Sequence, residues 1–312
     1  MDYSIERLDL RGPSVHGAGL FELYQSVTAA YPGGVYWYHG DSQESWRNVF
    51  LCLCGGRLIG KSQVMVYDEQ KSDSPETAEH KIYMTVRVLP EYEGETEVFD
   101  LLFEAAYKRA LELKRKFPCI RPCQFKMGNM DNETVYNQFC VKKGFRQHND
   151  IYHMTLSLEE NHVGAAAGKQ QVEEIGYRRF FLCNQDEKNR FLALEQKCFC
   201  GDDVMSPQRL ECLLDSDWVA AFCAEKDGEL VGAVFSECDG GPVMVEDLMV
   251  HPAFRRNGIA RNLLDMVISE AKKAGMEEIK LSVFTHNEEA LRVYTSAGFS
   301  VEALERRFVM YI

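Results

Sequence analysis

The 312-residue sequence has no long hydrophobic run, and this absence is the first constraint on its function. No stretch approaches the roughly 18 consecutive apolar residues that a membrane-spanning helix needs. The first residues, MDYSIERLDLRG, carry charges where a signal peptide would have its apolar core. We therefore expect a cytoplasmic protein that has no membrane partner.

Positive charge is also scarce, because 35 Lys and Arg residues stand against 48 Asp and Glu residues and leave a net charge of −13. A phosphate backbone would repel such a chain, so nucleic acid is not an expected partner. Zinc-site spacing is absent as well, since one residue separates Cys52 from Cys54 and Cys198 from Cys200. Without an export signal, we expect the 11 cysteines to be reduced thiols and to hold no metal.

The length points to two domains, at about 150 residues per domain. Hydrophobic residues make up 46% and charged residues 27%, as in ordinary globular proteins. Residues 161–171, NHVGAAAGKQQ, are small and polar without apolar periodicity, which is typical of a linker. We therefore predict a domain over 1–160, a linker over 161–171 and a domain over 172–312.

The two halves repeat the same order of signals, which indicates two copies of one α+β unit. Each half has a glycine-bounded turn before an apolar run (GGRLIG, DGELVG), a strand that ends in a proline motif (VLPEY, VHPAF), and an amphipathic helix. Each half then has a helix that ends in Gly-Phe, followed by a last strand, Ile151 to Leu156 in the first half and Phe308 to Ile312 in the second.

The elements of the second half can be placed from apolar periodicity and turn signals. We predict strands near Ile175–Leu182, Trp218–Glu225, Leu230–Glu237, Val243–Val250 and Glu278–Phe284, and helices near Asp186–Lys197, Pro207–Leu214, Ile259–Ala274 and Asn287–Ser296.

The stretch Val243 to Gly275 carries the strongest functional signal, because it reads as a strand, a short basic loop and an amphipathic helix. The N–H groups at a helix N-terminus have no intrahelical partner and favour an anion. Gly258 and Ala260 would let a pyrophosphate approach the backbone closely. Arg255, Arg256 and Arg261 add positive charge.

Together these motifs resemble the GNAT superfamily of N-acetyltransferases over the whole C-terminal half. The pyrophosphate loop of that family, Q/R-x-x-G-x-G/A, is matched by Arg255, Gly258 and Ala260, and its late Asn and Tyr by Asn287 and Tyr294. The resemblance implies two tandem GNAT-like domains of the α+β class, each with a mixed, mostly antiparallel central sheet flanked by helices. It implies acetyl-CoA as the cofactor, held by Leu248, Met249, Val250, Arg255, Arg256, Asn257, Gly258, Ile259, Ala260, Arg261 and Asn287.

Acetyl transfer to an amine needs a base, because an alkylamine has a pKa of about 10.4 and must lose a proton before it attacks. Glu246 is the candidate base, and Asp247 is the alternative if a bulge exchanges the facing of the strand. Tyr294 is the candidate acid for the departing thiolate, by its position in the family pattern.

The first copy lacks these groups. When Pro90 is aligned with Pro252, Thr96 stands opposite Gly258, and the loop PEYEGETEVF brings four glutamates to the phosphate position. Cys140 lies near the place of Tyr294. We therefore expect a degenerate N-terminal copy and an intact C-terminal one, a tandem arrangement similar to that of mycothiol synthase.

The acceptor region carries Asp202 and Asp203, and an acidic rim would attract a cationic acceptor. We expect a small-molecule amine, with a protein lysine or N-terminal amine as the alternative. A hypothesis of another class is a non-catalytic acyl-CoA-binding or interaction module.

Overall fold

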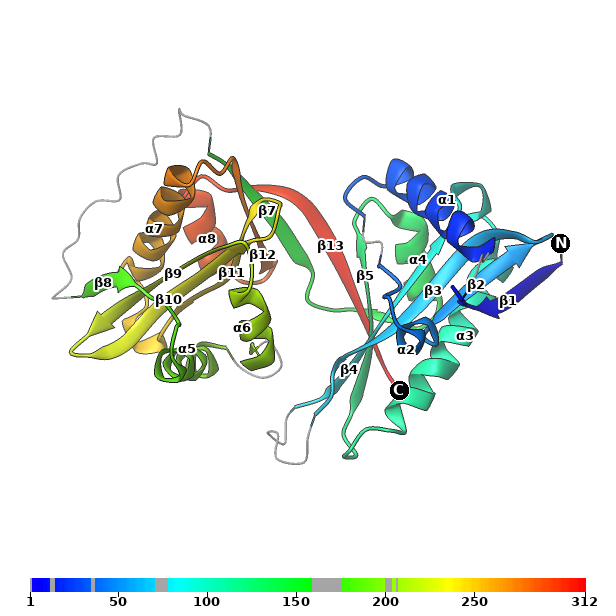
Figure 1. The fold of residues 1–312 in the computed structure, drawn as a ribbon, viewed down its shortest axis with the longest axis horizontal. Helices are drawn as coiled ribbons and strands as arrows, with labels where there is room; N and C mark the ends of the chain where they lie inside the picture. The colour runs from blue at the N-terminus through cyan, green and yellow to red at the C-terminus, as the bar shows by residue number, and fades with distance from the viewer. Residues whose placement is uncertain are drawn as a thin grey trace. The chain divides into compact units, whose positions relative to one another are not determined.

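The structure is a computed structural model that describes residues 2–11, 15–34, 37–70, 78–158, 175–199, 204–205 and 207–312. The predicted linker over 161–171, and also Asp202 and Asp203, lie outside these described residues. The chain divides into two compact units (Figure 1). We call Met1–Asp150 with Leu304–Ile312 the N-terminal unit, and Ile151–Ala303 the C-terminal unit.

The N-terminal unit is a mostly antiparallel sheet with helices on it. Its strands follow the order β1-β2-β3-β4-β5-β13, and β6 pairs with β13. Among the described strands of this unit, only β4 and β5 pair in parallel. The elements are β1 (Tyr3–Arg7), α1 (Val15–Ala30), α2 (Gln43–Trp46), β2 (Val49–Cys54), β3 (Arg57–Asp68), β4 (His80–Val88), η1 (Pro90–Tyr92), α3 (Thr96–Lys114), β5 (Cys123–Met130), α4 (Thr134–Lys142), β6 (Arg146–Gln147) and the end of β13 (Ser300–Tyr311).

The C-terminal unit repeats this design with the strand order β7-β12-β11-β10-β9-β8. Over the residues that the structure describes, β11 and β12 are its only parallel pair. The elements are β7 (Ile151–Ser157), β8 (Gly176–Arg179), α5 (Gln185–Cys198), α6 (Pro207–Leu214), β9 (Trp218–Lys226), β10 (Glu229–Cys238), β11 (Val243–Val250), η2 (Pro252–Phe254), α7 (Ile259–Lys273), β12 (Glu278–Phe284) and α8 (Glu288–Ser296). The α+β class with mixed, flanked sheets is confirmed, and the predicted elements of this half match within a few residues.

The last strand of each half belongs to the other unit, which corrects the sequence-based assignment. β7, predicted to close the first copy, pairs antiparallel with β12 from Ile151 to Ser157. The end of β13, predicted to close the second copy, pairs antiparallel with β5 from Glu305 to Tyr311. Alternation along a strand specifies which face is buried and does not specify the partner strand, so the sequence could not show this exchange.

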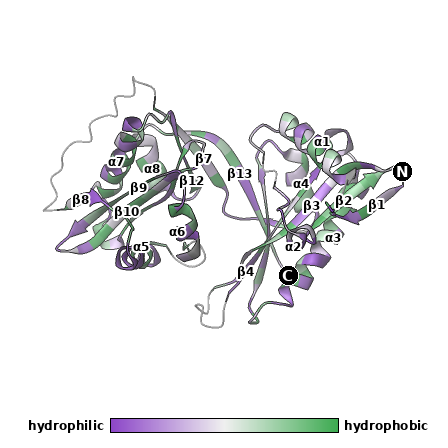
Figure 2. Ribbon diagram, in the orientation of Figure 1, coloured by the Kyte–Doolittle hydropathy of each residue, from purple (hydrophilic) through white to green (hydrophobic). Residues whose placement is uncertain are grey.

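The core of the C-terminal unit forms on both faces of its sheet. Leu263, Leu264, Val267 and Ala271 make the apolar stripe of α7 and are buried against one face. α7 approaches β10 so closely that a Cβ at Gly232 would lie 2.8 Å from Ile259 Cγ2. α5 and α6 cover the other face. Figure 2 shows the hydrophobic colour along the central strands.

The helices that end in Gly-Phe end as the sequence predicts. Gly144 and Gly298 have φ values of 86° and 100°, which suit glycine at a helix C-terminus. The N–H of Phe299 donates to the carbonyl of Tyr294, and the N–H of Phe145 donates to the carbonyl of Cys140. Tyr294 and Cys140 therefore hold equivalent places in the two units. Among the described helices, none is long and apolar enough to cross a membrane.

Candidate active site

The loop before α7 forms a bare helix N-terminus. Gly258 is the N-cap with φ 74°, a left-handed conformation that favours glycine, and Arg256 also has a positive φ of 64°. Within the described residues, no side chain caps this helix and its first turn has no acidic residue. The free N–H groups and the helix dipole make the loop a site for an anion such as a pyrophosphate.

A cleft of about 880 Å³ opens from this loop and is lined by the end of β11 and by α8. The strands β11 and β12 pair only over Val243–Val245 and Ile279–Leu281, and beyond that point they separate. The cleft is lined by Cys198, Phe199, Leu248, Met249, Val250, Phe254, Arg255, Arg256, Gly258, Ile259, Ala260, Arg261, Asn287, Glu288, Glu289, Ala290, Arg292, Val293 and Tyr294.

Most of the predicted site residues therefore lie along one cavity. Two do not line it: Asn257 donates to the Phe254 carbonyl at 3.2 Å, and Glu246 lies deeper in β11. Asn287 lines the cleft and also caps α8, because its Oδ1 accepts the Ala290 N–H at 3.2 Å. Arg261 is bound to Asp265 and to the Ser296 carbonyl, so its charge is held beside the loop.

The two carboxylates of β11 lie at a β-bulge. Asp247 pairs with Phe235 and Val245 pairs with Ser236, which leaves Glu246 as the extra residue. The bulge shifts the alternation of side chains between the two faces of the sheet by one residue. Val245 and Leu248 both pack on the α7 side, whereas Met249 packs on the α5 side. Asp247 alternates with Leu248 and therefore shares the α5 side with Met249.

Glu246 and Asp247 have different surroundings. Glu246 forms an ion pair of 2.7 Å with Arg209 of α6, whose side chain is half exposed. Asp247 is half-buried, but its Oδ2 is fully buried and has no hydrogen-bond partner among the described residues. Burial of the carboxyl, followed by the charges of Glu195 and Glu246, raises the pKa of Asp247 to about 8. A carboxylate with this pKa can act as a proton acceptor at mildly alkaline pH.

Tyr294 stands on the cleft wall close to Asp247. Burial, with the Asp247 charge as a smaller cause, raises the pKa of Tyr294 above its ordinary value. Its ring packs against Phe299 at a centroid distance of 6.0 Å, which fixes the side chain in place. The phenol therefore keeps its proton until a strong base arises next to it.

Glu195 is a site residue that sequence reasoning missed. It is fully buried on α5, and its Oε1 accepts the backbone N–H of Met205 at 2.6 Å. Burial raises the pKa of Glu195 to about 7. The sequence does contain one indication of this residue. Glu195 follows Phe191 and Leu194 at helical spacing, so a carboxylate occupies a core position of an amphipathic helix.

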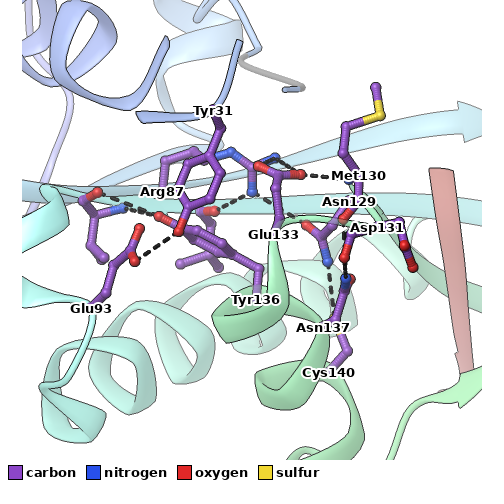
Figure 3. Close-up of polar contacts among 12 residues, drawn as sticks. Tyr31, Arg87, Glu93, Asn129, Met130, Asp131, Glu133, Tyr136, Asn137 and Cys140 are labelled. Carbon is purple, nitrogen blue, oxygen red and sulfur yellow. Dashed lines mark hydrogen bonds and ion pairs between the residues drawn. The ribbon is translucent and has the colours of Figure 1, made fainter. Parts of the chain in front are cut away.

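In the N-terminal unit, the protein's own side chains occupy the equivalent opening between β4 and β5 (Figure 3). These strands pair only over His80–Tyr83 and Cys123–Lys126 before they separate. Arg87 of β4 stands where Met249 stands in β11, and it forms a fully buried ion pair of 3.1 Å with Glu133. The hydroxyl of Tyr136 lies 3.3 Å from Val88 N and 3.4 Å from Val88 O, so the strand backbone is already bonded.

The positions of the N-terminal unit that correspond to the predicted catalytic residues are also changed. Counting back from Pro90, Met84 and Thr85 take the places of Glu246 and Asp247, and Cys140 takes that of Tyr294. The loop is one residue shorter than its counterpart, so the N-cap of α3 is Glu95 rather than the predicted Thr96. A carboxylate thus stands where the C-terminal unit has Gly258.

Comparisons with known proteins agree with this geometry. A model of the acetyltransferase (GNAT) family matches residues 188–299. Over 126 residues the chain is 33% identical to N-alpha-acetyltransferase RimI of Mycobacterium tuberculosis, an alignment that covers 39% of this chain and 78% of that relative.

Two solved structures resemble the whole chain. The first is a GCN5-related N-acetyltransferase from Sphaerobacter thermophilus, with a TM-score of 0.68 and 18% sequence identity. The superposition covers 99% of this chain and 95% of that protein. A tandem GNAT protein from the clavulanic acid biosynthesis pathway has a TM-score of 0.62 at 12% identity and is covered to 98%, again with 99% of this chain. At these identities the likeness shows a shared fold.

Proposed function

This chain belongs to the GNAT acetyltransferase family and is an N-acetyltransferase, and from its geometry we propose that the C-terminal unit acetylates a primary amine. One observation carries the proposal: the half-buried Asp247 and the buried Tyr294, two groups with raised pKa values, lie close together where β11 and β12 separate. The other end of the same opening is the bare N-terminus of α7.

Enzymes of this family use acetyl-CoA, and the cleft residues fit it. Gly258 and the first N–H groups of α7 would hold the pyrophosphate, with Arg255 and Arg256 adding positive charge. The edge of β11 at Leu248–Val250, left without β12 as a partner, would hold the pantetheine arm and face the thioester oxygen. Acetyl-CoA supplies the thioester whose carbonyl carbon the amine attacks.

The protein's own groups then move the protons. Asp247 takes a proton from the incoming ammonium, so that a neutral nitrogen can form the new C–N bond. Tyr294 gives its proton to the sulfur as the C–S bond breaks, and it recovers a proton released by the nitrogen. One proton leaves for solvent in each turnover, because an ammonium enters and an amide leaves. Asp247 is favoured over Glu246 because Arg209 already neutralises Glu246.

The acceptor is proposed to be a small cationic amine. Glu195, Glu246 and Asp247 gather three carboxylates near one arginine, Arg209, and this acidic environment favours a cation. The likeness to an N-alpha-acetyltransferase favours a second candidate, the N-terminal amine of a protein. Rates with small diamines and with short peptides that carry a free N-terminus distinguish the two acceptor classes.

Replacing Tyr294 by Phe tests the proposed function. The variant keeps the ring packing and loses the proton donor, so we expect kcat for thiol release to fall about 10²-fold while acetyl-CoA binding is unchanged. Release of free thiol is measured over the amine panel. An unchanged kcat would remove Tyr294 from the reaction, and an absence of turnover by the unmutated protein on every amine would contradict the proposed function.

The N-terminal unit is proposed to bind no acetyl-CoA. Support comes from the Arg87–Glu133 pair in its opening and from the glutamate at its helix N-cap.

Replacing Gly258 by Glu should therefore weaken acetyl-CoA binding by the whole protein at least about tenfold, because a carboxylate enters the phosphate site and glycine's conformation is lost. The acetyl-CoA-dependent rise in Tm measures this change. Thr96→Glu, on the first turn of α3, is the matched control and should leave the rise intact. Equal losses in both variants would argue that both units bind.

A further inference from the structure

The environment of Asp247 contains a second buried carboxylate that the reaction described above does not use. α5 packs on β11, and Glu195 belongs to the helix face that also buries Phe191 and Leu194. Asp247 shares this side of the sheet with Met249, which packs in the same cluster as those α5 residues. The two carboxylates therefore approach one another from facing elements.

Each carboxylate has one oxygen without a partner. Oε2 of Glu195 and Oδ2 of Asp247 are both buried and accept no hydrogen bond from the described residues. A buried carboxylate oxygen without a hydrogen-bond donor disfavours the ionised form of its group. Two such carboxylates on facing elements do not ionise together readily, because each negative charge disfavours ionisation of the other.

We propose that Glu195 is a positioning residue, whose negative charge on the facing helix controls when Asp247 can accept the proton of the acceptor amine. The inference rests on the proposed role of Asp247. The other charged or titratable groups around Asp247 are Glu246 on its own strand, Arg209 of α6 and Tyr294 of α8. Of the three carboxylates in this group, Glu246 is bound by Arg209, whereas Glu195 and Asp247 each have one buried oxygen without a hydrogen-bond partner among the described residues.

The hydrogen bond from Met205 N–H to Glu195 Oε1 suggests a purely structural role for Glu195. The variant Glu195→Gln distinguishes this structural role from an effect on Asp247. Glutamine keeps the Oε1 acceptor for Met205 and removes the negative charge. If Glu195 acts through Asp247, the loss of its charge makes Asp247 easier to ionise. The lower limb of the pH profile of kcat/KM should then move down by about one pH unit.

The experiment compares kcat/KM from pH 6 to pH 10 for the unmutated protein, Glu195→Gln and Asp247→Asn. All three proteins are measured with the same amine acceptor, so the ionisation of the acceptor contributes equally to each pH profile. Glu211→Gln is the matched control, because Glu211 is an exposed carboxylate of α6 bound to Lys188. A limb that moves in Glu195→Gln and not in Glu211→Gln supports the proposal. An unmoved limb in Glu195→Gln, with activity lost in Asp247→Asn, overturns it and leaves the proposed function standing.

If Asp247→Asn keeps the unmutated profile, the proposed function itself fails. A measurement on the unmutated protein covers the case in which Glu195→Gln does not fold. Carboxyl carbons labelled with ¹³C should show two coupled titrations between about pH 6 and pH 9. Titration of every carboxyl below pH 5 would overturn the proposal.

Discussion

Replacing Asp247 by Asn is expected to lower kcat/KM about 10³-fold at pH 8.5, a loss within the range for removal of a general base. The amide has nearly the shape of the carboxyl and cannot accept the proton of the amine. Acetyl-CoA binding should be unchanged, because Asp247 does not line the cofactor cleft.

The same variant should be more stable than the unmutated protein. The pKa of Asp247 in the fold is about 8, against an ordinary value of 3.8, so between these pH values the folded chain binds one more proton than the unfolded chain. Stability therefore falls as pH rises through this window, and Asn removes that fall. We expect a gain of about 1–3 kcal/mol at pH 8, seen as a rise in Tm of a few degrees, and little gain at pH 4.

Thiol release and thermal unfolding measured on one preparation test both effects. Asp217→Asn is the control, because Asp217 is an exposed aspartate before β9 and should change neither quantity. Loss of activity together with loss of stability would indicate a damaged fold rather than a missing base, and it would contradict the account.

Replacing Arg87 by Met should destabilise the N-terminal unit by about 3–5 kcal/mol. Arg87 is 1% exposed and Glu133 is 0% exposed, and the guanidinium also lies over the ring of Tyr136 at 4.7 Å. Burial raises the pKa of Glu133, and the Arg87 charge opposes this rise. Without Arg87, Glu133 must be protonated or remain as an unpaired buried charge.

Urea unfolding followed by the fluorescence of Trp37 and Trp46 reports on this unit, since both tryptophans lie within it. The double variant Arg87→Met with Glu133→Leu is the matched control and should recover most of the loss, because no unpaired charge remains. A single variant as stable as the unmutated protein would show that the pair contributes nothing. Equal losses in the single and double variants would show that packing, not charge, holds the opening closed.

Local patterns predicted the elements and the glycine-capped start of α7 well. The apolar stripe of α7, the glycine N-cap and the Gly-Phe helix ends depend on short-range geometry, which the sequence states directly. The choice between Glu246 and Asp247 depended on a bulge, and a bulge is a property of two paired strands. The sequence therefore left two candidates for the proposed base, and our choice of Asp247 rests on the three-dimensional surroundings of the two side chains.

The features that the sequence did not predict are contacts between distant segments. The exchange of β7 and β13 between sheets depends on strand partners far along the chain. Glu195 and Asp247 are separated by 52 positions, and Arg87 and Glu133 by 46, so their proximity leaves no local pattern. The sequence itself contains only one indication of these contacts, a carboxylate or a guanidinium at a position that the apolar periodicity assigns to the core.

Titration calorimetry of the full chain with acetyl-CoA tests the central claim most directly, namely that one of the two similar units holds the working site. We predict one molecule bound per chain and none, in the same concentration range, for Gly258→Glu. Two comparable sites, or a single site that survives Gly258→Glu, would contradict it.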